Sequence, residues 1–128
     1  MSLLLDTNIA ILLRDGDPHI TAAVARAGEG VFLSIVTQVE LEGGVYRDPA
    51  QAAVRRARLD VMLQSLPVAP FDEAAVLAYR AIVEAAGYSR RKLLDRMIAA
   101  QALVHHATLV TRNAADFADI PKLSLETW

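Results

Sequence analysis

Four acidic residues stand at positions from which they could build a metal site. Asp6 directly follows the apolar run of residues 3–5, and Glu40 lies one turn into a helix predicted after a second apolar run. Asp95 lies near the start of a later helix, and Asp116 comes shortly after another predicted strand. Converging carboxylates cannot all stay charged unless a cation lies between them. Mg²⁺ and Mn²⁺ prefer such oxygen ligands, and either ion activates water for phosphodiester hydrolysis.

Each of these acids also has an ordinary structural role open to it. Asp6 could cap the helix that follows, and Glu40 could close a capping box with Thr37. Asp95 could stabilise the start of its helix through the helix dipole. Asp116 could be a solvated surface acid. Spacing alone leaves both kinds of role open at every position.

The elements that must position the acids alternate between short strands and helices. We predict strands at residues 3–5, 31–34, 67–70, 108–111 and 123–125. We predict helices at residues 8–14, 19–27, 35–44, 48–66, 73–86 and 93–106, and a helical turn at 113–117. This alternation predicts βαβ units, and therefore an α/β fold around a central, mainly parallel sheet. Because strand carboxyl ends meet at one edge of such a sheet, the four acids could converge there.

Local composition adds expectations for individual elements. Two glycines, Gly43 and Gly44, should weaken and end the third helix. The strand at 67–70 is bounded by prolines and so belongs at an edge or end of the sheet. In the helix at 48–66 one stripe is formed by Val54, Ala57, Val61 and Ser65. Three arginines lie largely off that stripe, where they could contact a phosphate backbone or an acidic partner segment, although we favour a solvated face: Arg55, Arg56 and Arg58.

The bulk composition predicts a single folded domain over residues 1–128. Hydrophobic residues make up 54% and charged residues 22%, which excludes a disordered chain. There is no cysteine, so disulfides and thiolate metal sites are excluded, and the composition fits the cytoplasm. No apolar run is long enough for a membrane span. The net charge is −2, yet the basic residues are eleven arginines and two lysines, and arginine suits phosphate contacts.

The sequences around the four acids resemble the motifs of PIN domains, and they occur in the family's order. The matching segments are residues 4–9 (LLDTNI), 34–41 (SIVTQVEL), 94–102 (LDRMIAAQA) and 109–117 (LVTRNAADF). The end of the chain, residues 120–123 and Trp128, is similar to the tail of VapC-type toxins. Residues 3–128 therefore resemble the whole of a compact toxin of this type.

The resemblance implies a three-layer α/β/α sandwich and a Mg²⁺- or Mn²⁺-dependent endoribonuclease that acts as the toxin of a toxin–antitoxin pair. It implies an RNA substrate, a homodimer, and a small antitoxin through which alone the protein would contact DNA. The alternative is a PIN-like protein with little nuclease activity, which acts chiefly as a DNA-binding or autoregulatory partner of its antitoxin.

By the same resemblance, particular residues take particular roles. The catalytic acids would be Asp6, Glu40, Asp95 and Asp116. The metal ligands among them would be Asp6, Asp95 and Asp116. Polar side chains around them would be Thr7, Asn8, Ser34, Thr37, Thr111 and Asn113.

Several basic or acidic neighbours leave choices open. Glu42 competes with Glu40, but the two cannot share a helix face because a helix turns ~100° per residue. We choose Glu40 because Leu41 completes the motif beside it. Arg96, directly after the third acid, could face phosphate or solvent. Four residues near the third and fourth motifs could bind RNA phosphates or lie in solvated loops: Arg90, Arg91, Lys92 and Arg112.

Overall fold

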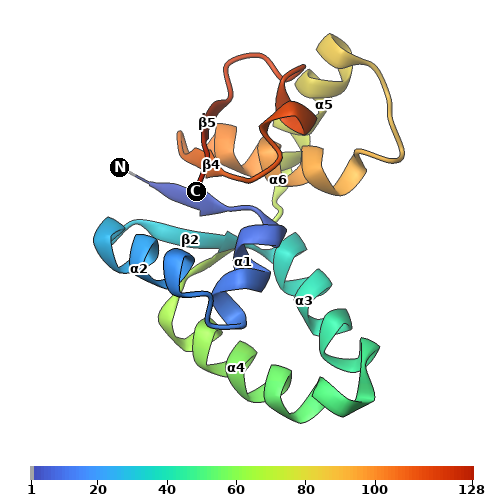
Figure 1. Ribbon diagram of the computed structural model, residues 1–128. Coiled ribbons are helices and arrows are strands. Elements are labelled where there is room, and N and C mark those ends of the chain that lie inside the picture. Colours follow the sequence, from blue (N-terminus) through green and yellow to red (C-terminus); the bar gives the residue numbers. More distant parts are fainter. Residues whose placement is uncertain (1) are drawn as a thin grey trace.

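The computed structural model describes residues 2–128 as a parallel sheet between helical layers (Figure 1). The strands are β1 (Leu3–Leu5), β2 (Val31–Ser34), β3 (Val68–Ala69), β4 (Thr108–Val110) and β5 (Ser124–Glu126). The helices are α1 (Thr7–Arg14), α2 (Pro18–Ala27), α3 (Ile35–Arg47), α4 (Ala52–Ser65), α5 (Glu73–Ala86) and α6 (Leu93–Val104). Two 3₁₀ helices add η1 (Pro49–Gln51) and η2 (Ala114–Phe117).

The sheet has the strand order β3-β2-β1-β4-β5, and every neighbouring pair is parallel. The α/β fold with a parallel central sheet is therefore confirmed. β1 is the middle strand, and β3, which follows Pro67, lies at one edge as its prolines predicted. Within residues 2–128, every helix is too short or too polar to cross a lipid bilayer.

Alternate residues of β1 supply two separate cores, one on each face of the sheet. Leu3 and Leu5 pack with Ile9 of α1 and Leu59 of α4. Leu4 points the other way, into a cluster that includes residues of α5 and α6. Figure 1 shows the same division, with α1, α2 and α4 on one side of the sheet and α5 and α6 on the other. The three-layer arrangement follows from this alternation.

Helix α3 differs from its expected form, because it continues through Gly43 and Gly44 as far as Arg47. The two glycines cost roughly 1 kcal/mol each in a helix interior. Burial of Leu41 and Val45, which are 1% and 0% exposed, contributes about 1.5–3 kcal/mol per side chain and offsets that cost. The long helix predicted at 48–66 is also divided, into η1 and then α4.

Helix α4 turns a different face to the core from the one its stripe indicated. Leu59 and Met62 are the buried residues, whereas Val54 and Val61 are 47% and 63% exposed. The helix packs against α1 and α3, and its Leu59 and Met62 enter the core with residues of β1 and β2, so this tertiary packing overrides the single stripe. The apolar stripe of α4 is therefore left at the surface.

The three arginines of α4 are not merely solvated, as we had expected. Arg55 donates from Nη1 to the carbonyl oxygen of Gly44 at 2.8 Å, and Arg58 donates from Nη1 to that of Asp15 at 3.0 Å. Arg56 binds acidic side chains of α3 and α4. The arginines thus fasten α4 to α3 and to the end of α1, because those elements expose carbonyl and carboxylate acceptors to it.

Candidate active site

Asp6 combines the two roles that the sequence left open. Its Oδ1 accepts a hydrogen bond from the Thr7 backbone N–H at 2.7 Å, so it caps α1. Its Oδ2 accepts from the Thr111 hydroxyl at 2.8 Å, which ties it to the end of β4. The residue is 4% exposed. Burial raises the pKa of Asp6, the hydrogen bonds from Thr111 and Thr7 lower it, and the charge of Asp116 raises it, with a net rise.

A chain of hydroxyl groups connects α1 to α3 and orients Glu40. The Thr7 hydroxyl donates to Glu40 Oε1 at 2.7 Å. Because a hydroxyl has only one proton to give, the Thr37 hydroxyl must be the donor in its 2.9 Å contact with Thr7 Oγ1. Glu40 is itself exposed, so its carboxylate faces solvent while half-buried Thr7 and buried Thr37 hold it in place.

Asp95, in the first turn of α6, is the acid whose pKa is affected by the charges of the other three. Burial raises the pKa of Asp95, and the negative charges of Asp6, Asp116 and Glu40 raise it further, against a lowering by Lys92, to about 6. These acids come from four different elements of the chain. Fully buried Ile98 fixes α6 against the sheet three residues beyond Asp95. The structure therefore brings Asp6, Glu40 and Asp95 to one pocket, and Asp116 lies close enough for its charge to raise the pKa of Asp6 and Asp95.

Asp116 is exposed on η2, and the neighbouring Phe117 holds that segment in place. Phe117 is 1% exposed in the core beneath α6. The next acid, Asp119, is occupied elsewhere, because it pairs with Lys92 at 3.4 Å and with Arg96 at 3.2 Å. Of the two acids in this segment, Asp116 is therefore the one available to join Asp6, Glu40 and Asp95.

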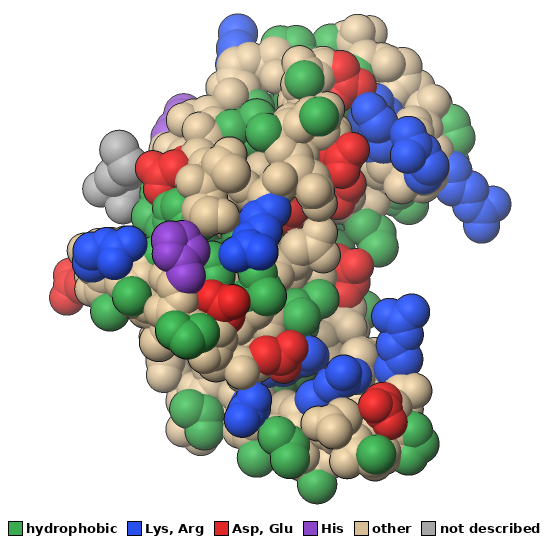
Figure 2. Space-filling view, viewed as in Figure 1, with side chains coloured by type: hydrophobic (Ala, Val, Ile, Leu, Met, Phe, Trp, Pro, Cys, Tyr) green, Lys and Arg blue, Asp and Glu red, His purple; other side chains and the backbone are tan. Residues whose placement is uncertain are grey.

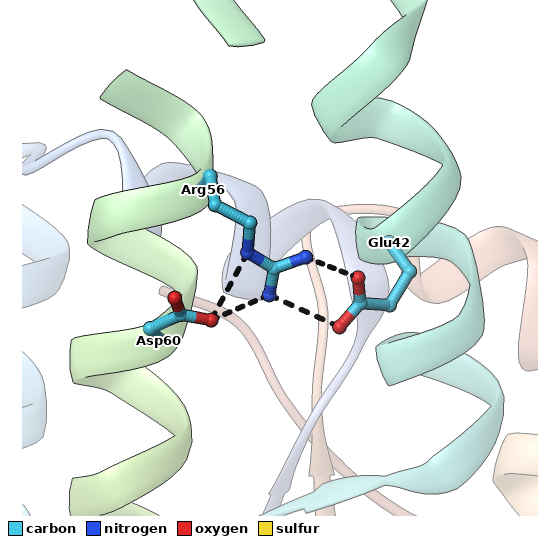
Figure 3. Close-up of polar contacts among 3 residues, drawn as sticks. All are labelled: Glu42, Arg56 and Asp60. Atoms are coloured by element: carbon cyan, nitrogen blue, oxygen red, sulfur yellow. Dashed lines mark hydrogen bonds and ion pairs between the residues drawn. The ribbon is translucent and has the colours of Figure 1, made fainter. Parts of the chain in front are cut away.

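Glu42 is likewise occupied, which favours the choice of Glu40. Arg56 bridges Glu42 of α3 and Asp60 of α4 (Figure 3), with Nη1 donating to Glu42 Oε2 at 2.5 Å and Nη2 to Asp60 Oδ1 at 2.6 Å. The hydrogen bond from Arg56 holds the pKa of Glu42 below its usual range. The two bonds raise the pKa of Arg56 in turn. This ion pair lies between α3 and α4.

Some of the predicted polar neighbours lie apart from the acids. Ser34 is fully buried, caps α3 by accepting from Val36 N–H, and donates its hydroxyl to Gln101 Oε1. It supports the frame and has no hydrogen bond to an acid within residues 2–128. Asn113 precedes η2 but makes no side-chain cap to it. Its backbone N–H donates to the Thr111 hydroxyl at 3.0 Å. Asn8 is exposed and lines the pocket beside Asp6.

The basic residues near the third motif divide into exposed and engaged groups. Arg90, Arg91 and Arg112 are exposed, and their role in binding RNA stays a prediction. Arg96 faces neither solvent nor an open phosphate site. It is 3% exposed, donates from Nη1 to the carbonyl oxygen of Gly87 at 2.5 Å, and pairs with Asp119. It joins the end of α5 to the loop after η2.

A polar pocket of about 660 Å³ connects the acids to residues that the sequence reasoning missed. Asp6, Glu40 and Asp95 line one part of it, and Arg14 lines another. Figure 2 shows acidic side chains gathered on the concave side of the molecule, with Lys and Arg side chains on either side of them. Helical spacing offered a signal for Arg14, since it follows Thr7 at i+7 and lies on the same face of α1.

The donor set fits a hard divalent cation in type and in charge. The charge of Asp116 raises the pKa of Asp6, and the charges of Asp6, Asp116 and Glu40 raise the pKa of Asp95. A bound cation would relieve this repulsion. Within residues 2–128, however, no three acidic or histidine side chains already have the mutual spacing of a closed metal site. Asp6 and Glu40 are instead held by hydroxyl groups, so the carboxylates would have to draw together around an ion.

Fold and site together define an α/β protein with an acidic cluster at one edge of a parallel sheet. The sequence model of the PIN domain matches residues 3–123, and the chain belongs to the PIN domain family. It is similar to Ribonuclease VapC2 of Rickettsia felis, with 28% identity over 134 residues, which cover 100% of this chain and 98% of that protein.

Solved structures give the same assignment. VapBC2 of Rickettsia felis, bound to a DNA fragment from its promoter, contains a chain that matches with a TM-score of 0.86 and 26% identity, over 100% of this chain and 99% of that chain. FitAcB of Neisseria gonorrhoeae matches with a TM-score of 0.80 and 28% identity, over 96% of this chain and 95% of that chain. The PIN fold predicted from the motifs is confirmed.

Proposed function

We propose that this protein is a metal-dependent endoribonuclease and the toxin of a toxin–antitoxin pair. The observation that carries the proposal is the polar pocket that Asp6, Glu40 and Asp95 line together, with the charge of Asp116 close by, since phosphodiester hydrolysis by a bound ion needs such a set of carboxylates. The similarity to Ribonuclease VapC2 over the whole chain supports the activity.

In this proposal Asp6, Asp95 and Asp116 hold Mg²⁺ or Mn²⁺. When bound there, such an ion would lower the pKa of a water and offset negative charge on the leaving oxygen. The hydroxyl of Thr111 fixes the carboxylate of Asp6, whose helix cap keeps it at the end of the rigid central strand. Glu40, oriented by Thr7 and lining the pocket, accepts a proton from the attacking water.

An antitoxin partner is supported by the complexes in which similar chains occur. VapBC2 of Rickettsia felis and FitAcB of Neisseria gonorrhoeae are such assemblies. This chain offers an apolar hollow of about 520 Å³ for an apolar segment of a partner, lined in part by Leu13, Val24, Val61 and Met62. DNA would be contacted through that partner. A homodimer stays a prediction.

A second candidate function is a regulatory partner with little nuclease activity. The observation that favours it is that VapBC2 of Rickettsia felis was captured on promoter DNA. The acid cluster argues against it, because neighbouring carboxylates are costly to keep charged without a cation, and a purely regulatory partner has no use for a bound cation. Cleavage assays separate the two candidates.

The test is incubation of the purified protein with total RNA in Mn²⁺, in Mg²⁺ and in EDTA. We expect cleavage with either metal and none in EDTA. Asp6→Asn should abolish cleavage, while Asp72→Asn, which alters the equivalent helix cap of α5 outside the site, should not. Cleavage in EDTA, or cleavage that survives Asp6→Asn, would contradict the mechanism. Expression without the antitoxin should arrest growth, and Asp6→Asn should relieve the arrest.

A further inference from the structure

Arg14, the last residue of α1, is a buried cation whose hydrogen-bonding capacity is only partly used. It is 6% exposed. Its Nε donates to Asp15 Oδ1 at 3.0 Å. No hydrogen bond within residues 2–128 engages Nη1 or Nη2. Burying a guanidinium is costly unless its N–H groups find acceptors. The two terminal nitrogens of Arg14, Nη1 and Nη2, are therefore able to donate hydrogen bonds to a ligand.

The free edge of this guanidinium faces the pocket that also holds the acids. A Cβ atom built on Gly44 would lie 3.6 Å from Arg14 Nη1, and Gly44 lines that same pocket. Nη1 and Nη2 are not among the fully enclosed unpaired atoms of residues 2–128. Arg14 lines both this pocket and the apolar hollow between α1, α2 and α4, and its Nη1 lies on the side of Gly44 and the acids. Because Gly44 has no side chain, it leaves room for a ligand beside Nη1.

Two further arginines near Arg14 carry positive charge that could attract an anionic ligand. Arg47 is exposed at this part of the pocket, and Arg55 is half-buried there with one N–H given to the Gly44 carbonyl. The two nearby acids are already engaged, since Asp15 binds Arg14 Nε and Asp48 accepts from Ala50 N–H. One pocket therefore has a carboxylate end and an arginine end.

We propose that Arg14 binds a backbone phosphate of the RNA substrate next to the phosphate that is cleaved. This inference rests on the proposed nuclease function, which it deepens. A guanidinium fork matches two phosphate oxygens. Asp6 and Arg14 are eight residues apart on α1, or ~12 Å along the helix, so the two ends of the pocket hold different phosphates.

An acidic peptide is the other conceivable occupant, and the pocket disfavours it. Carboxylates of such a peptide would meet Asp6, Glu40 and Asp95 in the same hollow. An RNA strand can place one phosphate at Arg14 and a second phosphate at the acids, where a bound cation would attract it. The arginine end would then set the register of the strand against the acids.

The test is the affinity of Arg14→Gln for a fluorescein-labelled, single-stranded oligoribonucleotide of mixed sequence. Fluorescence anisotropy in EDTA keeps the RNA intact, so binding can be read even if the wild type proves not to be a nuclease. We expect binding about tenfold to a hundredfold weaker. The plot of log affinity against log salt should become shallower by ~0.7, the share of one phosphate contact. In Mn²⁺, KM for cleavage should rise while kcat changes little.

Two further variants control for charge and folding. Arg26→Gln removes an exposed arginine of α2 outside the pocket and should bind RNA like the wild type. Gly44→Leu keeps Arg14 and Asp15 but fills the space before Nη1, and it should weaken RNA binding without lowering the melting temperature. Unchanged affinity and salt slope in Arg14→Gln and Gly44→Leu would overturn the proposal. So would an equal loss in Arg26→Gln, or a loss of antitoxin binding with RNA binding intact.

Discussion

Replacing Asp95 with asparagine should stabilise the metal-free protein at pH 8. Burial and the charges of Asp6, Asp116 and Glu40 raise the pKa of Asp95 to about 6, from an ordinary 3.8. The folded protein therefore keeps this proton over a pH range in which the unfolded chain has released it. Raising the pH through that range lowers the free energy of unfolding. Asparagine cannot ionise, so the variant escapes this loss.

The size of the effect follows from the same pKa. A rise from 3.8 to about 6 corresponds to ~3 kcal/mol at ~1.36 kcal/mol per pKa unit. Asp95 is only partly buried, and water screens its interactions, so we expect about 1 kcal/mol. For a chain of this length that is a rise in melting temperature of roughly 3–5 °C.

The assay is urea unfolding in EDTA at pH 4 and at pH 8, for the wild type and Asp95→Asn. The gain from Asp95→Asn should be present at pH 8 and mostly absent at pH 4. Asp119→Asn is a control of opposite sign, because Lys92 and Arg96 outweigh burial and hold the pKa of Asp119 below its usual range. It should destabilise the protein at pH 8. A destabilising Asp95→Asn at pH 8, or an effect that is equal at both pH values, would refute the reasoning.

Two other substitutions test the assignment of the site and of its frame. Glu40→Gln should lower kcat for RNA cleavage on the order of a hundredfold. Glu42→Gln loses only its pair with Arg56, which water screens, so it should retain activity with little change in stability. Equal losses of activity would contradict the choice of Glu40. Gln101→Leu should lower the free energy of unfolding by about 2–3 kcal/mol, because it leaves the Ser34 hydroxyl and the carbonyl oxygens of Ala69 and Pro70 without their hydrogen-bond partner. Gln64→Leu on the exposed side of α4 serves as its control in the same urea titration, and a matching change in both variants would count against the buried network.

The features that the sequence predicts well are those set by near neighbours in the chain. The run of residues 3–5 is apolar throughout because β1 is buried on both faces in the middle of the sheet. Asp6 comes at its carboxyl end, where a cap and a ligand need the same residue type. The fold and the meeting of the four acids follow from this alternation of strands and helices.

Features that depend on distant partners could not be predicted in the same way. Ser34 bonds to Gln101, 67 residues away, and Arg96 bonds to Asp119, 23 residues away. Either side chain could have faced the acids as far as local sequence is concerned. Helix α4 gave a misleading stripe because its buried face is set by the helices around it, which leave Val61 exposed.

The glycines of α3 show a third kind of limit. Propensity alone predicts that Gly43 and Gly44 end the helix. The helix continues because Leu41 and Val45 are buried and because Gly44 faces the side chain of Arg14. From sequence alone, a glycine that makes room for a side chain of another helix cannot be distinguished from a glycine that ends the helix in which it lies.

Calorimetric titration with Mn²⁺ tests most directly the central claim that these acids form one metal site. We predict that the wild type binds Mn²⁺, that Asp6→Asn and Asp95→Asn each weaken this binding at least about tenfold, and that Asp72→Asn binds as the wild type does. Binding near pH 6 should also release protons, because the ion displaces the proton of Asp95. Wild-type affinity for Mn²⁺ in Asp6→Asn and Asp95→Asn would contradict the claim.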